Sequence, residues 1–195
     1  MSEQENLWLR QIAENPGHSQ WYIKRFEDMA ARGVDLNGEA RMIDAMVGRG
    51  ARILDAGCGT GRVGGHLAEL GHEVAGVDLD PELIAAARKD HPEATWTVGD
   101  LSELRLEATF DVVVCAGNVM TFVAPSTRRT ILERFREHLA EGGRAVIGFG
   151  AGRGYEFDDF HRDAAAAGLR PDLMLSTWDL RPFGPDSDFL VAVFN

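Results

Sequence analysis

Cysteine is scarce in this chain of 195 residues, and its scarcity excludes two kinds of protein. The two cysteines, Cys58 and Cys115, have no ligand-like spacing to each other or to a histidine. They cannot build a disulfide framework, and they do not indicate a zinc site. We therefore expect no metal and a reducing, cytoplasmic setting.

The chain also has few basic residues and no long apolar run. Lysine and arginine number 20 against 31 aspartates and glutamates, so the formal net charge is -11. That charge opposes the long-range attraction to phosphate that drives non-specific nucleic-acid binding. No apolar run approaches the roughly 18 residues of a membrane span, and the polar N-terminus M-S-E-Q-E-N shows no targeting segment. We expect no nucleic-acid partner and no membrane, and we interpret one group of arginines as a solvated helix face: Arg128, Arg129, Arg134 and Arg136.

One glycine-rich stretch organises the rest of the chain. It covers Ala51–Arg62 and reads A-R-I-L-D-A-G-C-G-T-G-R. A short apolar run ends at Asp55, and Gly57, Gly59 and Gly61 then precede a helical pattern, which predicts strand, turn and helix. Because glycines leave main-chain N–H groups uncovered, this turn is a candidate nucleotide site.

Strand and helix patterns alternate after the glycine turn. They predict an α/β fold: a doubly wound, mostly parallel sheet of seven strands with helices on both faces. The last two strand patterns have no helix between them, so we expect the last strand to run antiparallel, near one edge of the sheet. The strands are expected at 52–54, 72–78, 95–98, 110–115, 144–149, 173–180 and 189–194. The helices are expected at about 38–47, 62–70, 81–89, 127–139 and 159–167, with two more within 6–31. Asn37 and Asp80 are the expected N-caps of the helices at 38–47 and 81–89.

The third glycine decides which nucleotide the turn suits. A dinucleotide fingerprint would place it at position 62, which is Arg62, whereas here it is Gly61. The pattern D-x-G-x-G-x-G from Asp55 to Gly61 instead resembles motif I of the class I S-adenosylmethionine (SAM) dependent methyltransferases. The resemblance implies SAM as the cofactor and the Rossmann-like fold of that family. It also implies that the loop binds SAM through Asp55, Ala56, Gly57, Cys58, Gly59, Gly61 and Arg62.

Two acids at strand ends extend the resemblance. Ligands of parallel α/β sheets bind outside the carboxyl ends of the strands. Asp78 ends the second strand 21 positions after Gly57, where an acid meets a ribose diol, although a turn or capping role is the alternative. Asp100 resembles the family's acid that accepts from the adenine amino group, with Leu101 packing near the ring. We expect Asp78, Leu79, Asp100 and Leu101 to bind the cofactor.

The fourth strand end is similar to motif IV of the small-molecule branch of this family. It lacks the N-P-P-Y or D-P-P-Y sequence of enzymes that methylate amino groups in nucleic acids. We expect it to contact the cofactor through Cys115, Ala116, Gly117 and Asn118. The apolar residues after it either wall a substrate pocket or pack in the core: Val119, Met120 and Phe122.

The N-terminal segment 6–31 carries two helical patterns broken by an N-P-G turn. In the second, spacings of three and four between Tyr22, Phe26 and Met29 make an amphipathic stripe. Members of the resembling family often use an N-terminal helix as a cap, which implies that Tyr22 or Arg25 reaches the SAM carboxylate. Plain packing against the domain is the alternative.

The resemblance covers residues 37–195, so we expect a SAM-binding methyltransferase domain there and a helical cap at 1–36. It implies in-line transfer of a methyl group from SAM to a small-molecule acceptor, without identifying a catalytic residue. The alternatives are a non-catalytic protein that binds SAM or S-adenosylhomocysteine (SAH), and a NAD-binding oxidoreductase. We expect the acceptor to lie near the N-terminal helices, the loop after Asn118 and the segment around Tyr155. Further nominations near it are Glu156, His161, Trp178 and Arg181.

Overall fold

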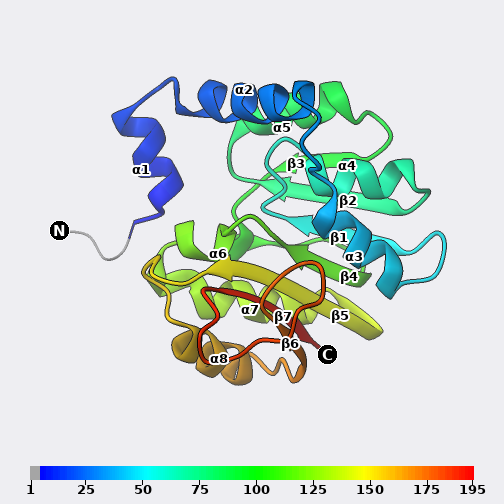
Figure 1. The fold of residues 1–195 in the computed structure, drawn as a ribbon, viewed down its shortest axis with the longest axis vertical. Coiled ribbons are helices and arrows are strands. Elements are labelled where there is room, and N and C mark those ends of the chain that lie inside the picture. Colours follow the sequence, from blue (N-terminus) through cyan, green and yellow to red (C-terminus); the bar gives the residue numbers. More distant parts are fainter. Residues whose placement is uncertain (1–4) are drawn as a thin grey trace.

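The computed structural model describes residues 5–195, which form helical layers on both faces of a seven-stranded sheet (Figure 1). The strand order is β3-β2-β1-β4-β5-β7-β6. The strand β7 runs antiparallel to both of its neighbours, and the other pairs are parallel. The expected fold class is confirmed, including the antiparallel last strand. The strands are β1 (Arg52–Ala56), β2 (Glu73–Asp78), β3 (Thr95–Val98), β4 (Phe110–Cys115), β5 (Leu139–Gly150), β6 (Pro171–Leu175) and β7 (Phe189–Phe194).

Apolar residues fill both faces of the central strands because helices cover both faces. Neighbouring strand residues point to opposite faces, so Ile53 packs in one core cluster and Leu54 in the other. One cluster includes residues of α3, α4 and α5, and the other includes residues of α7 and α8. The helices are α1 (Leu7–Glu14), α2 (His18–Ala31), α3 (Gly38–Met46), α4 (Arg62–Glu69), α5 (Pro81–Asp90), α6 (Val119–Phe122), α7 (Arg128–Glu137) and α8 (Phe157–Ala166). Two short 3₁₀ helices, η1 (Leu101–Glu103) and η2 (Pro125–Thr127), complete the set.

Helix α4 packs unusually close to the sheet, which explains a glycine in its interior. A Cβ on Gly64 would lie 3.0 Å from the ring of Trp96 and 2.9 Å from Oδ2 of Asp55. A glycine inside a helix costs about 0.5–1 kcal/mol relative to alanine. The close approach it allows lets the first turn of α4 contact the end of β1.

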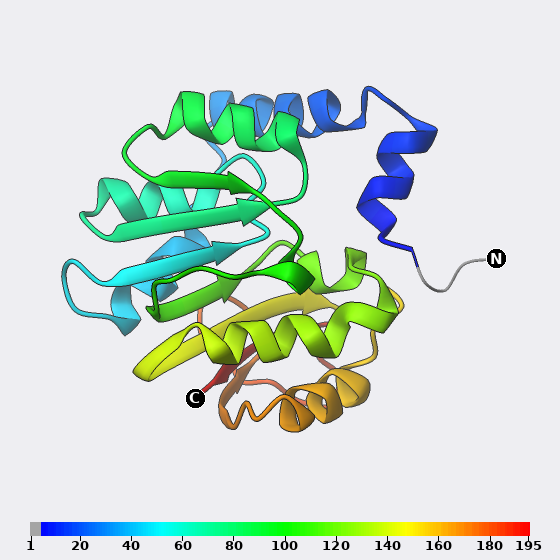
Figure 2. The ribbon, with the colours of Figure 1, turned by 180° about the vertical axis from the view of Figure 1, so that it is seen from behind.

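The N-terminal helices lie outside the layers (Figures 1 and 2). Helix α2 runs along α5, and α1 turns across the carboxyl ends of the strands. Asn6 caps α1, since its side chain accepts from the N–H groups of Trp8 and Leu9. The break between the two helices is where the sequence predicts it. Residues 1–4 of the expected cap at 1–36 lie outside the described residues, and the division into cap and domain stays a prediction.

Three local expectations are wrong. The strand predicted at 173–180 ends at Leu175, because Ser176 N–H donates to the carbonyl of Arg181 and Leu180 adopts a φ of +70° in a turn. Strand β5 begins at Leu139 rather than at position 144, with an irregular register opposite β4. Asn37 precedes α3 but makes no side-chain cap. None of the helices in residues 5–195 combines the length and apolar character that crossing a bilayer requires.

Candidate active site

A cavity of about 490 Å³ lies where β1, β2, β3 and β4 end, beneath α1 and α2. The sequence-predicted residues that line it are Tyr22, Arg25, Gly57, Gly59, Arg62, Asp78, Leu79, Asp100, Leu101, Gly117 and Asn118. A smaller cavity of about 50 Å³ beside it is lined by Asp55, Cys58 and Ala116, among others. Three predicted residues line neither cavity: Ala56, Gly61 and Cys115. The structure thus gathers most of the predicted site at one edge of the sheet.

The path of the glycine turn requires glycine. Gly57, Gly59 and Gly61 have φ angles of +79°, +56° and +78°, which side chains rarely adopt. A Cβ on Gly57 would also lie 2.5 Å from a methyl carbon of Val119. The N–H of Gly57 donates to the carbonyl of Val77 at 2.8 Å, which joins the turn to the end of β2. The turn therefore presents bare main chain to the cavity.

Asp78 is fixed at the end of β2 by two main-chain donors. One carboxylate oxygen accepts from the N–H of Gly59 and the other from the N–H of Asp80, each at 2.9 Å. Burial raises the pKa of the Asp78 carboxyl above its usual range. A carboxylate has about four acceptor positions, so Asp78 retains capacity for a hydroxyl pair in the cavity.

Asp100 both caps a short helix and lines the cavity. One of its oxygens accepts from both the N–H and the hydroxyl of Ser102, at 2.8 Å each, and caps η1. The other oxygen makes no hydrogen bond within residues 5–195, and the residue lines the cavity. This geometry leaves one acceptor for a ligand amino group.

Asp55 is a buried support beneath the turn. Its Oδ2 accepts from the N–H of Gly64 at 2.8 Å, and burial raises its pKa to about 7. Burial also raises the pKa of the thiols of Cys58 and Cys115, so both stay protonated at neutral pH. Asp55 thus joins the end of β1 to the first turn of α4, and the two thiols offer no thiolate nucleophile.

Arg62 lines the cavity, but its guanidinium is already engaged. Both terminal nitrogens bond the carboxylate of Glu39, at 2.5 and 2.9 Å, and one also donates to the carbonyl of Leu36. The pair is largely buried, so Arg62 ties α4 to α3 and to the segment before it. Its expected contact with the cofactor stays a prediction, and the geometry supports a scaffolding role beside it.

Aromatic side chains from α1, α2 and α6 form one wall of the cavity. The ring of Trp8 lies 5.3 Å from that of Tyr22 and 5.9 Å from that of Phe122, both edge-to-face. The hydroxyl of Tyr22 has no hydrogen-bond partner within the described chain, and burial raises its pKa. Arg25 lies over the ring of Phe26, at 5.9 Å from its centre. The wall is apolar, with a protonated phenol and a cation at its margin.

The fourth strand end turns sharply at Gly117 and Asn118, which have φ angles of +71° and +68°. Asn118 Oδ1 accepts from the N–H of Gly150 at 2.8 Å, which joins the turn to the end of β5. Of the apolar residues that follow, Val119 and Phe122 line the cavity. Met120 is buried in the core instead.

The acceptor residues nominated near the C-terminal half lie elsewhere. Tyr155 is buried, stacks on Phe149 and donates to Asp163 at 2.7 Å, so it is a core residue. The remaining nominations do not line the cavity: Glu156, His161, Trp178 and Arg181. The cavity includes Asn6, Trp8 and Arg153 in their place. No spacing in the sequence identifies these three, because tertiary packing brings them to the cavity.

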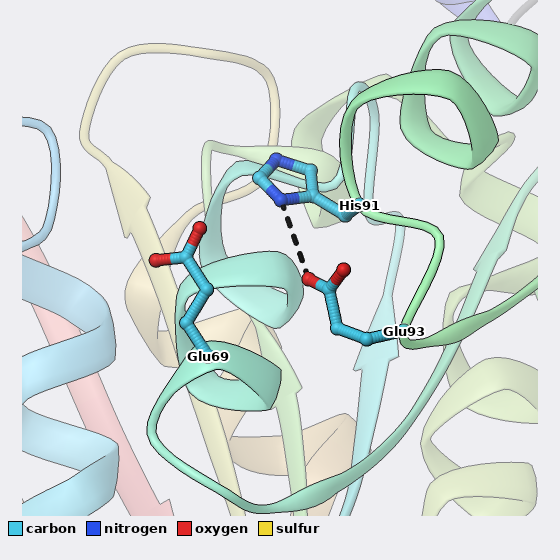
Figure 3. Close-up of side chains that lie close together, drawn as sticks. All are labelled: Glu69, His91 and Glu93. Carbon is cyan, nitrogen blue, oxygen red and sulfur yellow. Dashed lines mark ion pairs between the residues drawn. The ribbon is translucent and has the colours of Figure 1, made fainter.

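A separate polar cluster lies at the last residue of α4 and in the segment that follows α5 (Figure 3). It contains Glu69, His91 and Glu93, whose nearest ligand atoms lie within 4.8 Å of one another. His91 Nδ1 is 3.7 Å from a Glu93 oxygen, while Glu69 is 58% exposed and already paired with His66 at 3.1 Å. These contacts describe a surface ion-pair group, and the expectation of no metal stays a prediction.

The cavity has the chemistry that a nucleoside linked to an amino acid requires. Its bare main-chain turn, its two separated acids and its aromatic wall fit the polar groups, the ribose and the sulfonium of SAM. Fold and site together define a Rossmann-like nucleotide-binding protein of the class I methyltransferase type.

Comparison with known proteins agrees with this class. Residues 53–143 match the family described as methyltransferase domain. The crystal structure of a TehB-like SAM-dependent methyltransferase from Corynebacterium glutamicum superposes with a TM-score of 0.90 at 54% identity, over 93% of this chain and 99% of that one. The chain therefore belongs to the SAM-dependent methyltransferases. Its expected cofactor, SAM, is confirmed, and the NAD-binding alternative is set aside.

Two characterised relatives are more distant. One is a dTDP-3-amino-3,6-dideoxy-alpha-D-glucopyranose N,N-dimethyltransferase from Streptomyces fradiae, 32% identical over 60% of this chain and 48% of that protein. Another is a malonyl-[acyl-carrier protein] O-methyltransferase from Pectobacterium atrosepticum, 30% identical over 68% of this chain and 50% of that protein. The chain spans about half the length of these curated relatives.

Proposed function

We propose that this protein transfers the methyl group of SAM to a small-molecule acceptor by direct in-line displacement. The observation that carries the proposal is one cavity lined by two kinds of group: the glycine turn with Asp78 and Asp100, and the aromatic wall around Trp8 and Phe122. We assign the first group to a cofactor half of the cavity and the second to an acceptor half. A cofactor in the first half can therefore present a reactive group to an acceptor in the second.

In the cofactor half, each polar group has a proposed partner. Asp78 accepts from the ribose hydroxyls, and the free oxygen of Asp100 accepts from the adenine amino group. The bare main chain at Gly57 and Gly59 follows the methionine portion. Arg25 or Tyr22, on the helix above the turn, binds the carboxylate of the cofactor, because both line the cavity from that side.

The chain's part in this reaction is to orient and to exclude water. SAM supplies a methyl group on a positively charged sulfur, which is already an activated leaving group. Alignment of the acceptor with that methyl group can supply several kcal/mol of the rate enhancement. The phenol of Tyr22 and the thiols stay protonated, so they can donate or pack but do not attack.

The proposed acceptor is apolar or weakly polar and carries an amine or a hydroxyl. Two aromatic rings on the acceptor side and the named relatives, which act on an amino sugar and on a malonyl group, support a small acceptor. Nucleic acid is disfavoured, since Arg129 pairs with Glu133 and Arg134 with Glu137 on α7. Two of the four arginines of that helix are thus paired with acids, and the formal net charge of the protein is -11.

We propose two further features of the protein. Residues 1–36 act as a helical cap over a methyltransferase domain at 37–195. The protein works in a reducing, cytoplasmic compartment, which two free, buried cysteines support.

Calorimetric titration of the purified protein with SAM, SAH and NAD tests the cofactor part of the proposal. We expect saturable binding of SAM and SAH and none of NAD. Incubation with methyl-labelled SAM and a panel of small amines and alcohols then tests the transfer, with the Asp78→Ala variant as the matched control. Tight SAH binding without transfer to any member of a broad panel would favour a non-catalytic binding protein.

A further inference from the structure

Asp80 is a buried carboxylate that does more than begin a helix. It is 1% exposed, and its side chain accepts four hydrogen bonds. One oxygen accepts from the N–H groups of Glu82 and Leu83 and caps α5. The other accepts from the indole N–H of Trp8 at 2.9 Å and the hydroxyl of Ser19 at 2.6 Å. Its two oxygens thus serve separate parts of the molecule.

The same residue also contacts the proposed ribose acid. The N–H of Asp80 donates to Oδ1 of Asp78 at 2.9 Å, and Oδ2 of Asp78 accepts from the N–H of Gly59. A continuous series of hydrogen bonds therefore runs from α1 and α2 through Asp80 and Asp78 to the glycine turn.

Trp8, the donor at the N-terminal end of this series, also lines the cavity. Its ring packs edge-to-face against Tyr22 and Phe122. The proposed function assigns this part of the cavity to the acceptor. Contacts of α1 with the rest of the protein are otherwise few, and none of its residues is buried. The bond from Trp8 to Asp80 therefore has a large part in fixing where this ring lies.

We propose that Asp80 is a positioning residue that holds Trp8 over the acceptor half of the cavity and couples the N-terminal helices to the cofactor acid Asp78. The inference rests on the proposed function for the identity of the two halves. Occupancy of the ribose position then stabilises the closed position of α1 and α2, and closure of these helices in turn orders Asp78.

The competing account is that Asp80 only caps α5, and one substitution separates the two. Asparagine caps helices about as well as aspartate, so Asp80→Asn retains the bonds to Glu82 and Leu83. Its amide nitrogen cannot accept from an indole N–H, so the bond to Trp8 is lost. The hydroxyl of Ser19 can reverse its role and accept from that amide. The variant thus removes the Trp8 contact and keeps the cap.

Hydrogen exchange of the ligand-free protein is the direct test. In Asp80→Asn we expect the amides of residues 7–14 to exchange about tenfold faster, because a hydrogen bond to a charged group is lost. The amides of 82–90 should keep their protection, since the cap remains. Trp8→Phe removes the donor but keeps an aromatic ring, and should give the same result. Asp28→Asn, which removes an exposed acid paired with Lys24 on α2, is the matched control and should leave α1 unchanged.

The double variant and the ligand complete the test. If Trp8 and Asp80 act through one bond, the combined variant exchanges no faster than either single one. Addition of SAH should protect 7–31 in the parent and much less in Asp80→Asn, with SAH affinity reduced several-fold. Parent-like exchange of α1 in Asp80→Asn, or effects that multiply in the double variant, would overturn the proposal. A parent protein that binds no SAH would instead refute the proposed function, while the ligand-free exchange still decides the contact.

Discussion

At the scale of single residues, Asp78 is the side chain on which cofactor binding should depend most. It contacts the glycine turn and the start of α5, and it lines the cavity. Since a hydrogen bond to a charged group contributes about 1.5–3 kcal/mol, Asp78→Ala should weaken SAH binding by about ten- to a hundredfold. Calorimetry measures this, with Glu133→Ala as the control, because Glu133 is a half-exposed residue of α7 that does not line the cavity. An affinity within about twofold of the parent would contradict the ribose assignment.

Asp100 allows a finer test because one ligand group can be removed. Asp100→Ala should lower the affinity for SAH strongly and the affinity for an SAH analogue without the adenine amino group only slightly. Competition binding with the two ligands measures the difference. Ser102→Ala serves as the control, because it disturbs the η1 cap without touching the free oxygen. Equal losses for both ligands would make Asp100 a structural turn residue.

Asp55 predicts a pH dependence of stability. Its folded-state pKa of about 7 lies above the ordinary value of 3.8, so between these values the folded protein binds the proton more tightly than the unfolded chain. The contribution of Asp55 to stability is therefore present below about pH 4 and is lost as the pH rises to about 7. The slope is at most about 1.4 kcal/mol per pH unit. Asp55→Asn should lose this component, and urea unfolding at several pH values measures it. Parallel curves for parent and variant would contradict the shift.

At the scale of secondary-structure elements, the N-terminal helices should tighten on binding. Segments that close over a cofactor belong to the less stable parts of a fold. We expect amides between Gln20 and Arg32 to gain protection with SAH, measured by hydrogen exchange, with the buried strand β4 as an internal control. Identical exchange with and without ligand would mean that α2 only packs against the domain and does not close over the ligand.

The secondary-structure elements also show which features of the fold can be predicted from the sequence. The glycine turn, Asp78 and the α5 cap follow from local chemistry, and the structure has them where the sequence predicts them. The end of β6 and the burial of Tyr155 depend on packing partners that no local spacing encodes. Helix α1 is joined to the domain by a bond between Trp8 and Asp80, which are 72 positions apart in the sequence. The segments that line the cavity were therefore predictable, including the one after Asn118 that contributes Val119 and Phe122, whereas Trp8 and Arg153 were not identified individually.

At the scale of the whole molecule, charge argues against nucleic acid. A formal charge of -11 repels phosphates, and two of the four arginines on α7 pair with neighbouring glutamates. We expect no saturable binding of tRNA or duplex DNA at physiological salt. Filter binding across a salt series measures this, with a basic nucleic-acid-binding protein as the positive control. Saturable binding together with methyl transfer to the nucleic acid would contradict the small-acceptor proposal.

The central claim is that one cavity presents the cofactor to an acceptor beneath the aromatic wall. A crystal structure with SAH tests it most directly. The account predicts that the ribose hydroxyls lie against Asp78 and the adenine amino group against Asp100, with the sulfur facing the space between Trp8 and Phe122. A sulfur directed away from that space, or a space filled by side chains once SAH is bound, would contradict it.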